Sequence, residues 1–89
     1  MAAKRIKIIG SVQGVFFRAN AKEKAEELEL IGWVKNCPDG SVETHAEGSP
    51  ESISEFEQWC SHGPQTAIVE SVKSEDTREA GYESFEIVR

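Results

Sequence analysis

The chain has 89 residues, of which 38% are hydrophobic and 29% charged, and its formal net charge is −6. This length predicts one domain, residues 1–89, with a single modest core. The apolar stretches are too short to span a membrane and the amino terminus lacks the apolar core of a signal peptide, so we expect a cytoplasmic protein. The acidic balance argues against a general nucleic-acid surface.

Cysteine and histidine give no indication of a metal centre. Cys37 and Cys60, the only cysteines, form no CxxC pair and have no matching histidine spacing, while His45 and His62 stand alone. We therefore expect neither a zinc site nor a disulfide, and two reduced structural thiols.

The charges are unevenly distributed along the chain. Residues 1–24 carry six basic side chains and one acidic one, a net of +5, whereas residues 25–89 carry four basic and fifteen acidic ones, a net of −11. The first segment could therefore attract a small anion, while the rest of the chain would repel a long polyanion.

The first two elements are a strand and a helix. Residues 5–12 alternate, with Ile6, Ile8 and Val12 on one side, which is the period of a half-buried strand. Apolar residues from about 17 to 30 recur at helical spacing, and we place the end of this helix at Gly32. Its start is open, because Asn20 with Glu23 fits a capping box but the stretch also fits a start nearer Arg18.

The stretch GSVQGVFFR, residues 10–18, joins this strand to this helix. Two glycines four residues apart allow a tight turn with inward-facing N–H groups, and the helix start adds its unpaired amides. Arg18 supplies a planar cationic fork that suits phosphate or carboxylate. The stretch matches neither a Walker loop nor a dinucleotide loop, and a plain turn with a surface arginine is the simpler interpretation of the pattern alone.

A hairpin follows the helix. Residues 33–37 form the second expected strand, and Pro38-Asp39-Gly40 is a turn tripeptide. The third strand covers residues 41–47, and its residues 42, 44 and 46 should face the core. Residues 43, 45 and 47 should then face solvent, which places His45 on the solvent side.

The second half repeats the pattern of helix and strand. Ser49-Pro50-Glu51 is typical of a helix start, with Ile53, Phe56 and Cys60 as the buried stripe and Gly63-Pro64 as the stop. Residues 67–75 and 82–88 are the remaining strand candidates, with a polar loop over residues 75–81.

This order predicts an α+β fold, a ferredoxin-like βαββαβ sandwich. Such a fold has a mainly antiparallel sheet with two helices on one face, and the chain has a possible fifth strand. The first and second strands run parallel with the third between them, so their carboxyl ends share one rim of the sheet. The loop before Arg18 and the side chain of Asn36 should therefore converge.

GSVQGVFFR, residues 10–18, and GWVKNCPDGSVE, residues 32–43, closely resemble the paired signature of the acylphosphatase family. The resemblance continues through Gly63-Pro64 to Phe85-Glu86-Ile87. It implies hydrolysis of the carboxyl–phosphate anhydride of a small acyl phosphate without a metal. We also expect no other cofactor, a monomer, and competitive inhibition by inorganic phosphate. Departures are Ala21, where relatives often carry threonine, and Leu28-Glu29-Leu30, where they carry Leu-Gly-Leu. Ala21 bears on the rate of the reaction and not on its type. The change from Leu-Gly-Leu to Leu28-Glu29-Leu30 is structural.

The resemblance also assigns roles to residues. Arg18 would bind the phosphoryl group and Asn36 would position the attacking water. Backbone amides would hold the phosphate oxygens along the phosphate-binding loop, Gln13, Gly14, Val15, Phe16, Phe17 and Arg18. We interpret the side chains of Trp33, Phe16 and Phe17 as packing or rim residues. Without the resemblance, a structural role explains Asn36 equally well: its side chain could hydrogen-bond the backbone of the turn ahead of Pro38.

The site would contain no pair of nucleophile and base, but hydrolysis of an acyl phosphate requires few catalytic groups. The departing carboxylate is a stable anion near neutral pH, and phosphoryl transfer requires mainly positioning and charge-stabilising donors. Two alternatives remain open. One is a non-catalytic module that binds an acyl phosphate, and the other, less favoured, is an RNA-binding ferredoxin-like domain, for which the outer face of the third strand lacks aromatic residues.

Overall fold

The computed structural model describes residues 1–14 and 16–88; Val15, a member of the predicted loop, and Arg89 lie outside the described residues. The helices and strands are β1 (Ala2–Ser11), α1 (Phe17–Glu27), β2 (Ile31–Asn36), β3 (Val42–Gly48), α2 (Pro50–His62), β4 (Ile68–Asp76) and β5 (Phe85–Val88). The predicted order is confirmed, and the possible fifth strand is present as β5.

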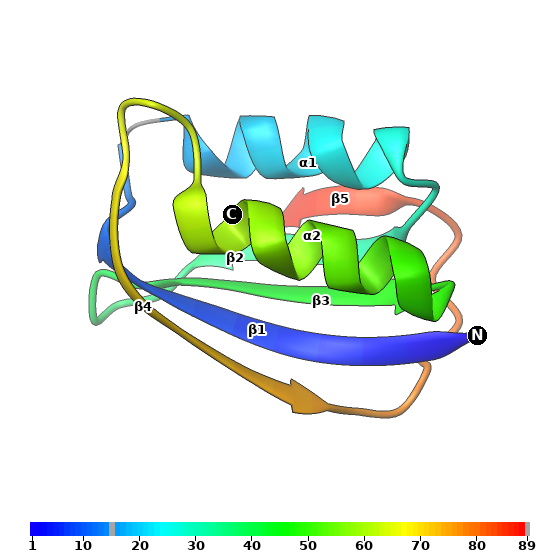
Figure 1. Cartoon of the computed structure of the whole chain (residues 1–89). Coiled ribbons are helices and arrows are strands. Elements are labelled where there is room, and N and C mark those ends of the chain that lie inside the picture. Colours follow the sequence, from blue (N-terminus) through cyan, green and yellow to red (C-terminus); the bar gives the residue numbers. More distant parts are fainter. Residues whose placement is uncertain (15, 89) are drawn as a thin grey trace.

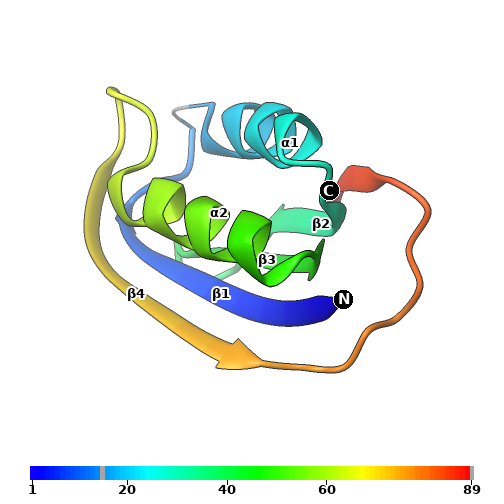
Figure 2. The ribbon, with the colours of Figure 1, turned by 45° about the vertical axis from the view of Figure 1, so that its right-hand side comes forward.

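The five strands form one sheet in the order β4-β1-β3-β2-β5. Both β1 and β2 pair antiparallel with β3, so they run parallel to each other, and β5 pairs parallel with β2. Both helices lie on the same side of this sheet (Figures 1 and 2). The ferredoxin-like sandwich expected from the element order is therefore confirmed.

The core lies between the sheet and the two helices. Alternate strand positions such as Ile6, Ile8 and Val34 are fully buried, and α2 contributes the predicted stripe of Ile53, Phe56 and Cys60. Both cysteines are free thiols, and burial raises the pKa of Cys60 far above its ordinary value.

The boundaries of α1 differ from the prediction at its carboxyl end. The helix ends at Glu27, not at Gly32, and Glu29 takes a left-handed conformation with φ 60°. Leu30 N donates to Ala25 O at 2.8 Å and Glu29 N donates to Glu26 O at 3.0 Å, the two bonds of a Schellman ending. Glu29 is the position at which relatives carry the glycine of Leu-Gly-Leu. This departure from the family pattern therefore concerns the end of the helix and is structural.

Gly32 belongs to β2 and has a packing role there. Its φ is 140°, and a Cβ atom at this position would lie 1.8 Å from the carbonyl oxygen of His45 on β3. Only glycine allows the two strands to approach so closely here. Sequence reasoning took this glycine as a helix stop because glycine serves both purposes.

His45 is buried, with 2% of its surface exposed, so its predicted position on the solvent side is wrong. Its ring stacks on Trp33 at 6.0 Å and meets the edge of Tyr82 at 5.4 Å, and its Nε2 lies 2.6 Å from Oε2 of Glu47. Residues 77–84, which connect β4 to β5, bring Tyr82 over this face. The alternation correctly separated the two faces, but it could not show that a later loop covers the second.

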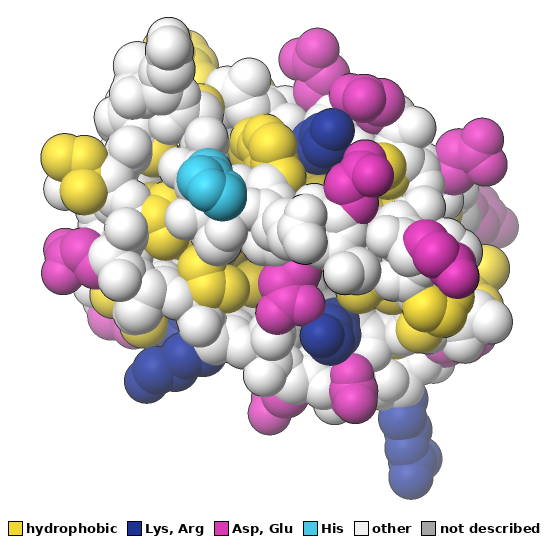
Figure 3. All heavy atoms as spheres, in the orientation of Figure 1, with side chains coloured by type: hydrophobic (Ala, Val, Ile, Leu, Met, Phe, Trp, Pro, Cys, Tyr) yellow, Lys and Arg dark blue, Asp and Glu magenta, His cyan; other side chains and the backbone are white. Residues whose placement is uncertain are grey.

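The surface carries no broad basic area on the face shown in Figure 3, where acidic side chains outnumber the scattered Lys and Arg side chains. Such a face does not suit a long polyanion. Neither helix of the described chain is long and apolar enough to cross a membrane.

Glu47 should make the stability of the fold depend on acid pH. Burial disfavours its charge, but hydrogen bonds from the Ala80 amide, His45 and the Gly81 amide outweigh burial and lower the pKa of Glu47. The carboxylate therefore stabilises the fold fully above pH 4.5, the ordinary glutamate pKa, and less as the pH falls through its lower folded-state value.

Glu47→Gln should lower the free energy of unfolding at pH 7 by about 2 kcal/mol, because the hydrogen bonds to a charged acceptor are weakened. It should also flatten the loss of stability below pH 4.5. Urea unfolding followed by tryptophan fluorescence across pH 3–7 measures both effects. The control Glu83→Gln, at an exposed position, should keep the parental slope; the same slope in Glu47→Gln would contradict the assignment.

Candidate active site

Among the described residues of the loop between β1 and α1, Gly14 with φ 74° and Phe16 with φ 61° are left-handed. A left-handed residue followed by helical residues turns successive N–H groups to one side, a concave arrangement that binds anions. Glycine takes this conformation freely, whereas it is strained for a bulky residue such as Phe16. Strain of this kind is typical of functional loops.

The amino end of α1 is unusual because it lacks a side-chain cap. Its first hydrogen bond runs from Asn20 N to Phe16 O at 3.0 Å, so the amides of residues 17–19 precede it and have no acceptor in the helix. No side chain of the described residues caps this end, and its first turn contains no acidic residue. By contrast, Ser49 Oγ caps α2 and Glu51 lies in its first turn.

The start of the helix also differs from the predicted alternatives. Asn20 does not cap the helix with Glu23; its Nδ2 donates to Phe16 O at 2.8 Å instead. The helix begins at Phe17, next to Arg18, as the second alternative had it. The Phe16 carbonyl thus accepts both the main-chain and the side-chain N–H of Asn20, which holds the strained residue in place.

Arg18 lies in the first turn of α1 and is half-buried. Its Nη1 donates a long hydrogen bond of 3.4 Å to the carbonyl oxygen of Val88 on β5. With respect to the residues that the structure describes, most of the guanidinium fork is available. A cation is unfavourable at the positive end of a helix dipole. An anion bound here would offset both charges at once.

Asn36 is the last residue of β2 and lies two positions after the buried Val34. It therefore faces the helix side of the sheet, at the rim where the parallel strands β1 and β2 both end. Figure 1 shows the loop before α1 and the β2–β3 turn at this same end of the molecule. In the described part of the chain the Asn36 side chain has no hydrogen-bond partner, so the interpretation as a turn asparagine is not supported.

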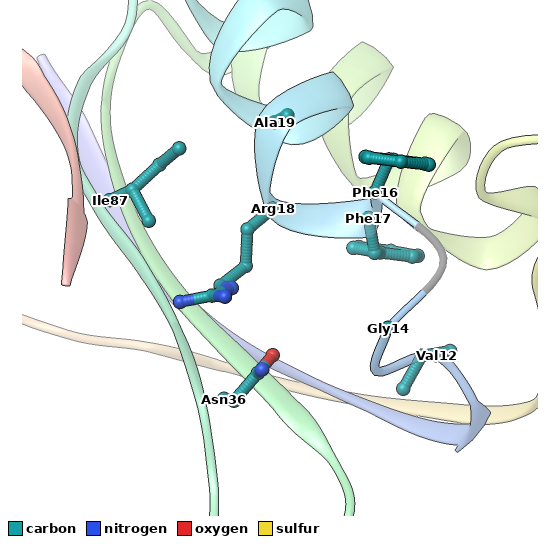
Figure 4. Close-up of a pocket in the computed structure, with 8 residues that line it drawn as sticks. All are labelled: Val12, Gly14, Phe16, Phe17, Arg18, Ala19, Asn36 and Ile87. Carbon is teal, nitrogen blue, oxygen red and sulfur yellow. The ribbon is translucent and has the colours of Figure 1, made fainter. Parts of the chain in front are cut away.

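A cavity of about 330 Å³ opens at this rim, and its lining residues are Val12, Gly14, Phe16, Phe17, Arg18, Ala19, Asn36 and Ile87. Arg18 and Asn36 point toward each other across it (Figure 4). The structure thus brings together the two side chains that the topology and the resemblance predicted. The lining described here includes no acidic side chain, so nothing in it would repel an anion.

Gln13 has a role that sequence reasoning missed. Its Nε2 donates to the carbonyl oxygens of Cys37 at 2.7 Å and Ser41 at 2.9 Å, so its side chain ties the β1–α1 loop to the β2–β3 turn. Gln13 was predicted only as a backbone donor. These partners lie 24 and 28 residues away in the chain, beyond the reach of any local pattern.

The β2–β3 turn is itself well supported. Oδ1 of Asp39 accepts hydrogen bonds from Ser41 N at 3.0 Å and Ser41 Oγ at 2.6 Å, and Lys7 lies 2.9 Å from the same carboxylate. These contacts with Ser41 and Lys7 lower the pKa of Asp39. The turn chemistry predicted for Asp39 and Gly40 is confirmed, and it fixes the residues that follow Asn36.

Three other predicted features lie away from the cavity. Ala21 is fully buried in the core. It is not among the residues that line the cavity. Neither histidine lines the cavity. Over residues 1–14 and 16–88, no three His, Cys, Asp or Glu side chains are grouped as potential metal ligands.

Fold and site together define a small ferredoxin-like α/β protein with an anion-accepting cavity at one rim of its sheet. The family model described as acylphosphatase matches residues 4–87. An acylphosphatase from Synechococcus sp. (strain RCC307) is 47% identical over 83 residues, 93% of this chain and 71% of that protein. The chain therefore belongs to the acylphosphatase family of enzymes.

Solved structures agree with this family. The acylphosphatase from Bacillus subtilis has a TM-score of 0.96 and is 36% identical, with both chains covered completely. The acylphosphatase from Coxiella burnetii has a TM-score of 0.94 and is 40% identical, covering 98% of this chain and 92% of that one.

Gln13→Ala should lower turnover of benzoyl phosphate by about ten- to a hundredfold, because small displacements between reacting groups are costly. The stability loss should be modest, about 1 kcal/mol, since the two lost hydrogen bonds lie near the surface. Steady-state kinetics and urea unfolding measure the two effects separately. Gln65→Ala, at an exposed position before β4, is the matched control. Full turnover in a destabilised Gln13→Ala protein would mean that the contact is structural only.

Proposed function

We propose that this acylphosphatase hydrolyses acyl phosphates with Arg18 and the loop amides as the phosphate site and Asn36 as the residue that orients water. The observation that carries the proposal is that Arg18 and Asn36, from separate elements, share one cavity at the uncapped start of α1. Arginine, free helix-start amides and a neutral amide side chain are a donor set suited to phosphoryl transfer.

The phosphoryl group would be held from two sides. The Arg18 fork would bind two of its oxygens, and the amides from Gln13 to Arg18, including Gly14, Val15, Phe16 and Phe17, would surround it from the loop. Donors placed in this way would stabilise charge on the equatorial oxygens. Inorganic phosphate, the product, carries the same oxygens and should occupy the same site.

The bond changes follow from the substrate. Water oxygen attacks phosphorus, the bond between phosphorus and the acyl oxygen breaks, and the carboxylate departs with the electron pair. The dianionic acyl phosphate and one water thus give a carboxylate and dihydrogen phosphate, so atoms and charge balance. The carboxylate is the weakly basic anion of an acid with a pKa near 4, so it needs no protein acid.

Asn36 would align the attacking water. Its carbonyl oxygen accepts a hydrogen bond from water, and its Nδ2 donates one to a phosphate oxygen. A phosphate oxygen of the substrate would take the water proton, since the cavity lining described above holds no carboxylate or imidazole. The cytoplasmic location, the monomeric state and the lack of a nucleic-acid partner stay predictions from the sequence.

Arg18→Ala should abolish measurable hydrolysis of benzoyl phosphate and leave the domain folded, because the side chain is half-buried and its one hydrogen bond among residues 1–14 and 16–88 is long. Asn36→Ala should lower kcat about a hundredfold, the usual effect of removing one well-placed donor, with less effect on phosphate binding. Arg78→Ala, at an exposed position, controls for loss of a cation. Folded and fully active Arg18→Ala protein would sink the proposal.

Inorganic phosphate should inhibit competitively against benzoyl phosphate, and excess chelator should leave the rate unchanged, because Arg18 and the amides supply the positive charge. Phosphate release measured with and without chelator tests the second point directly. Mixed or non-competitive inhibition would indicate separate sites, and loss of activity with chelator would show that a metal takes part. A protein that bound phosphate but never turned over substrate would be the binding module instead.

A further inference from the structure

The cavity has walls of two chemical kinds. Arg18 and Asn36 are polar and face each other, whereas Phe16 and Ile87 are apolar and lie on either side of the Arg18 side chain (Figure 4). An inorganic phosphate would use only the polar part. The apolar part is therefore available for the group that the phosphate carries.

Phe16 is an exposed apolar lining residue, with 77% of its surface accessible. A single exposed apolar side chain is ordinary on a protein surface. Phe16 differs because it lines the cavity, its backbone is in the left-handed region, and Asn20 holds its carbonyl oxygen with two hydrogen bonds of 3.0 and 2.8 Å. The loop thus holds Phe16 in a strained conformation at the edge of the cavity, and its aromatic side chain is exposed to solvent.

The charges of the lining limit what the ring can contact. Among the residues described as lining the cavity, Arg18 is the only cation, and the proposed function assigns it to the phosphoryl group. A second carboxylate or phosphate on the acyl group would find no cationic partner there. An apolar acyl group, by contrast, gains from contact with an exposed ring.

We propose that the acyl group of the substrate packs on the Phe16 ring, which makes the enzyme selective for acyl phosphates with an apolar, planar acyl group, such as an aromatic one. This inference rests on the proposed function. It makes Phe16 a specificity-determining residue: its side chain contacts the acyl group, while its backbone belongs to the phosphate loop.

The test compares benzoyl, acetyl and succinyl phosphate in the wild type and in Phe16→Ala, Phe16→Tyr and Ile68→Ala. The readout is the ratio of kcat/KM between substrates, because the intrinsic reactivity of each acyl phosphate cancels when ratios are compared across variants. Phe16→Ala should lower the ratio of benzoyl to acetyl phosphate about tenfold, mainly through KM, since ground state and transition state use the ring alike. Phe16→Tyr should retain the ratio. Succinyl phosphate has a longer acyl group, but this group carries a carboxylate in addition to the phosphate, so it should gain nothing from the ring.

Ile68→Ala removes another exposed apolar side chain, 66% accessible and outside the cavity, and should leave the ratio unchanged. Inhibition by inorganic phosphate reports on the loop itself. An unchanged ratio in Phe16→Ala would overturn the inference, and so would a lowered ratio that comes with an equally weakened phosphate inhibition. Hydrolysis of none of the three substrates by the wild type would overturn the proposed function, which is a different outcome.

Discussion

The uncompensated positive end of α1 is the constraint on which the site depends. The amides of residues 17–19 precede the first helical hydrogen bond, and no side chain in the described part of the chain caps them. Arg18 adds a cation in the same turn. Helix α2 shows the ordinary solution in the same molecule, with Ser49 as its cap and Glu51 near its start. A helix without a capping side chain is less stable by about 1 kcal/mol. That loss leaves its amides free, and a bound anion recovers it.

The two halves of the site are joined by side chains that take no part in the proposed chemistry. Gln13 ties the loop to the β2–β3 turn, and Asp39 with Ser41 closes that turn immediately after Asn36. The parallel course of β1 and β2 brings both segments to one rim, but topology alone leaves their separation uncertain by several ångströms. Hydrogen bonds of 2.7 and 2.9 Å from one amide remove that freedom.

The sequence predicted the element order, the sheet topology and the convergence of Arg18 with Asn36, because these follow from local periodicity and from chain-connection rules. It did not predict the buried pair of His45 and Glu47. Their burial depends on residues 77–84 crossing a face of the sheet, and no local pattern encodes such a crossing. The end of α1 was misplaced for a related reason, since Glu29 takes a conformation that pattern rules reserve for glycine.

The distribution of charge suggests how an acidic protein can hold an acidic substrate. The chain carries −6 overall, yet residues 1–24 carry a net of +5 and contain Arg18 and the loop. Beyond about 8 Å, the screening length in physiological salt, the surrounding carboxylates have little influence on a substrate in the cavity. Within that distance Arg18 and fixed amide dipoles dominate. Binding at this site therefore depends on short-range geometry more than on the net field of the molecule.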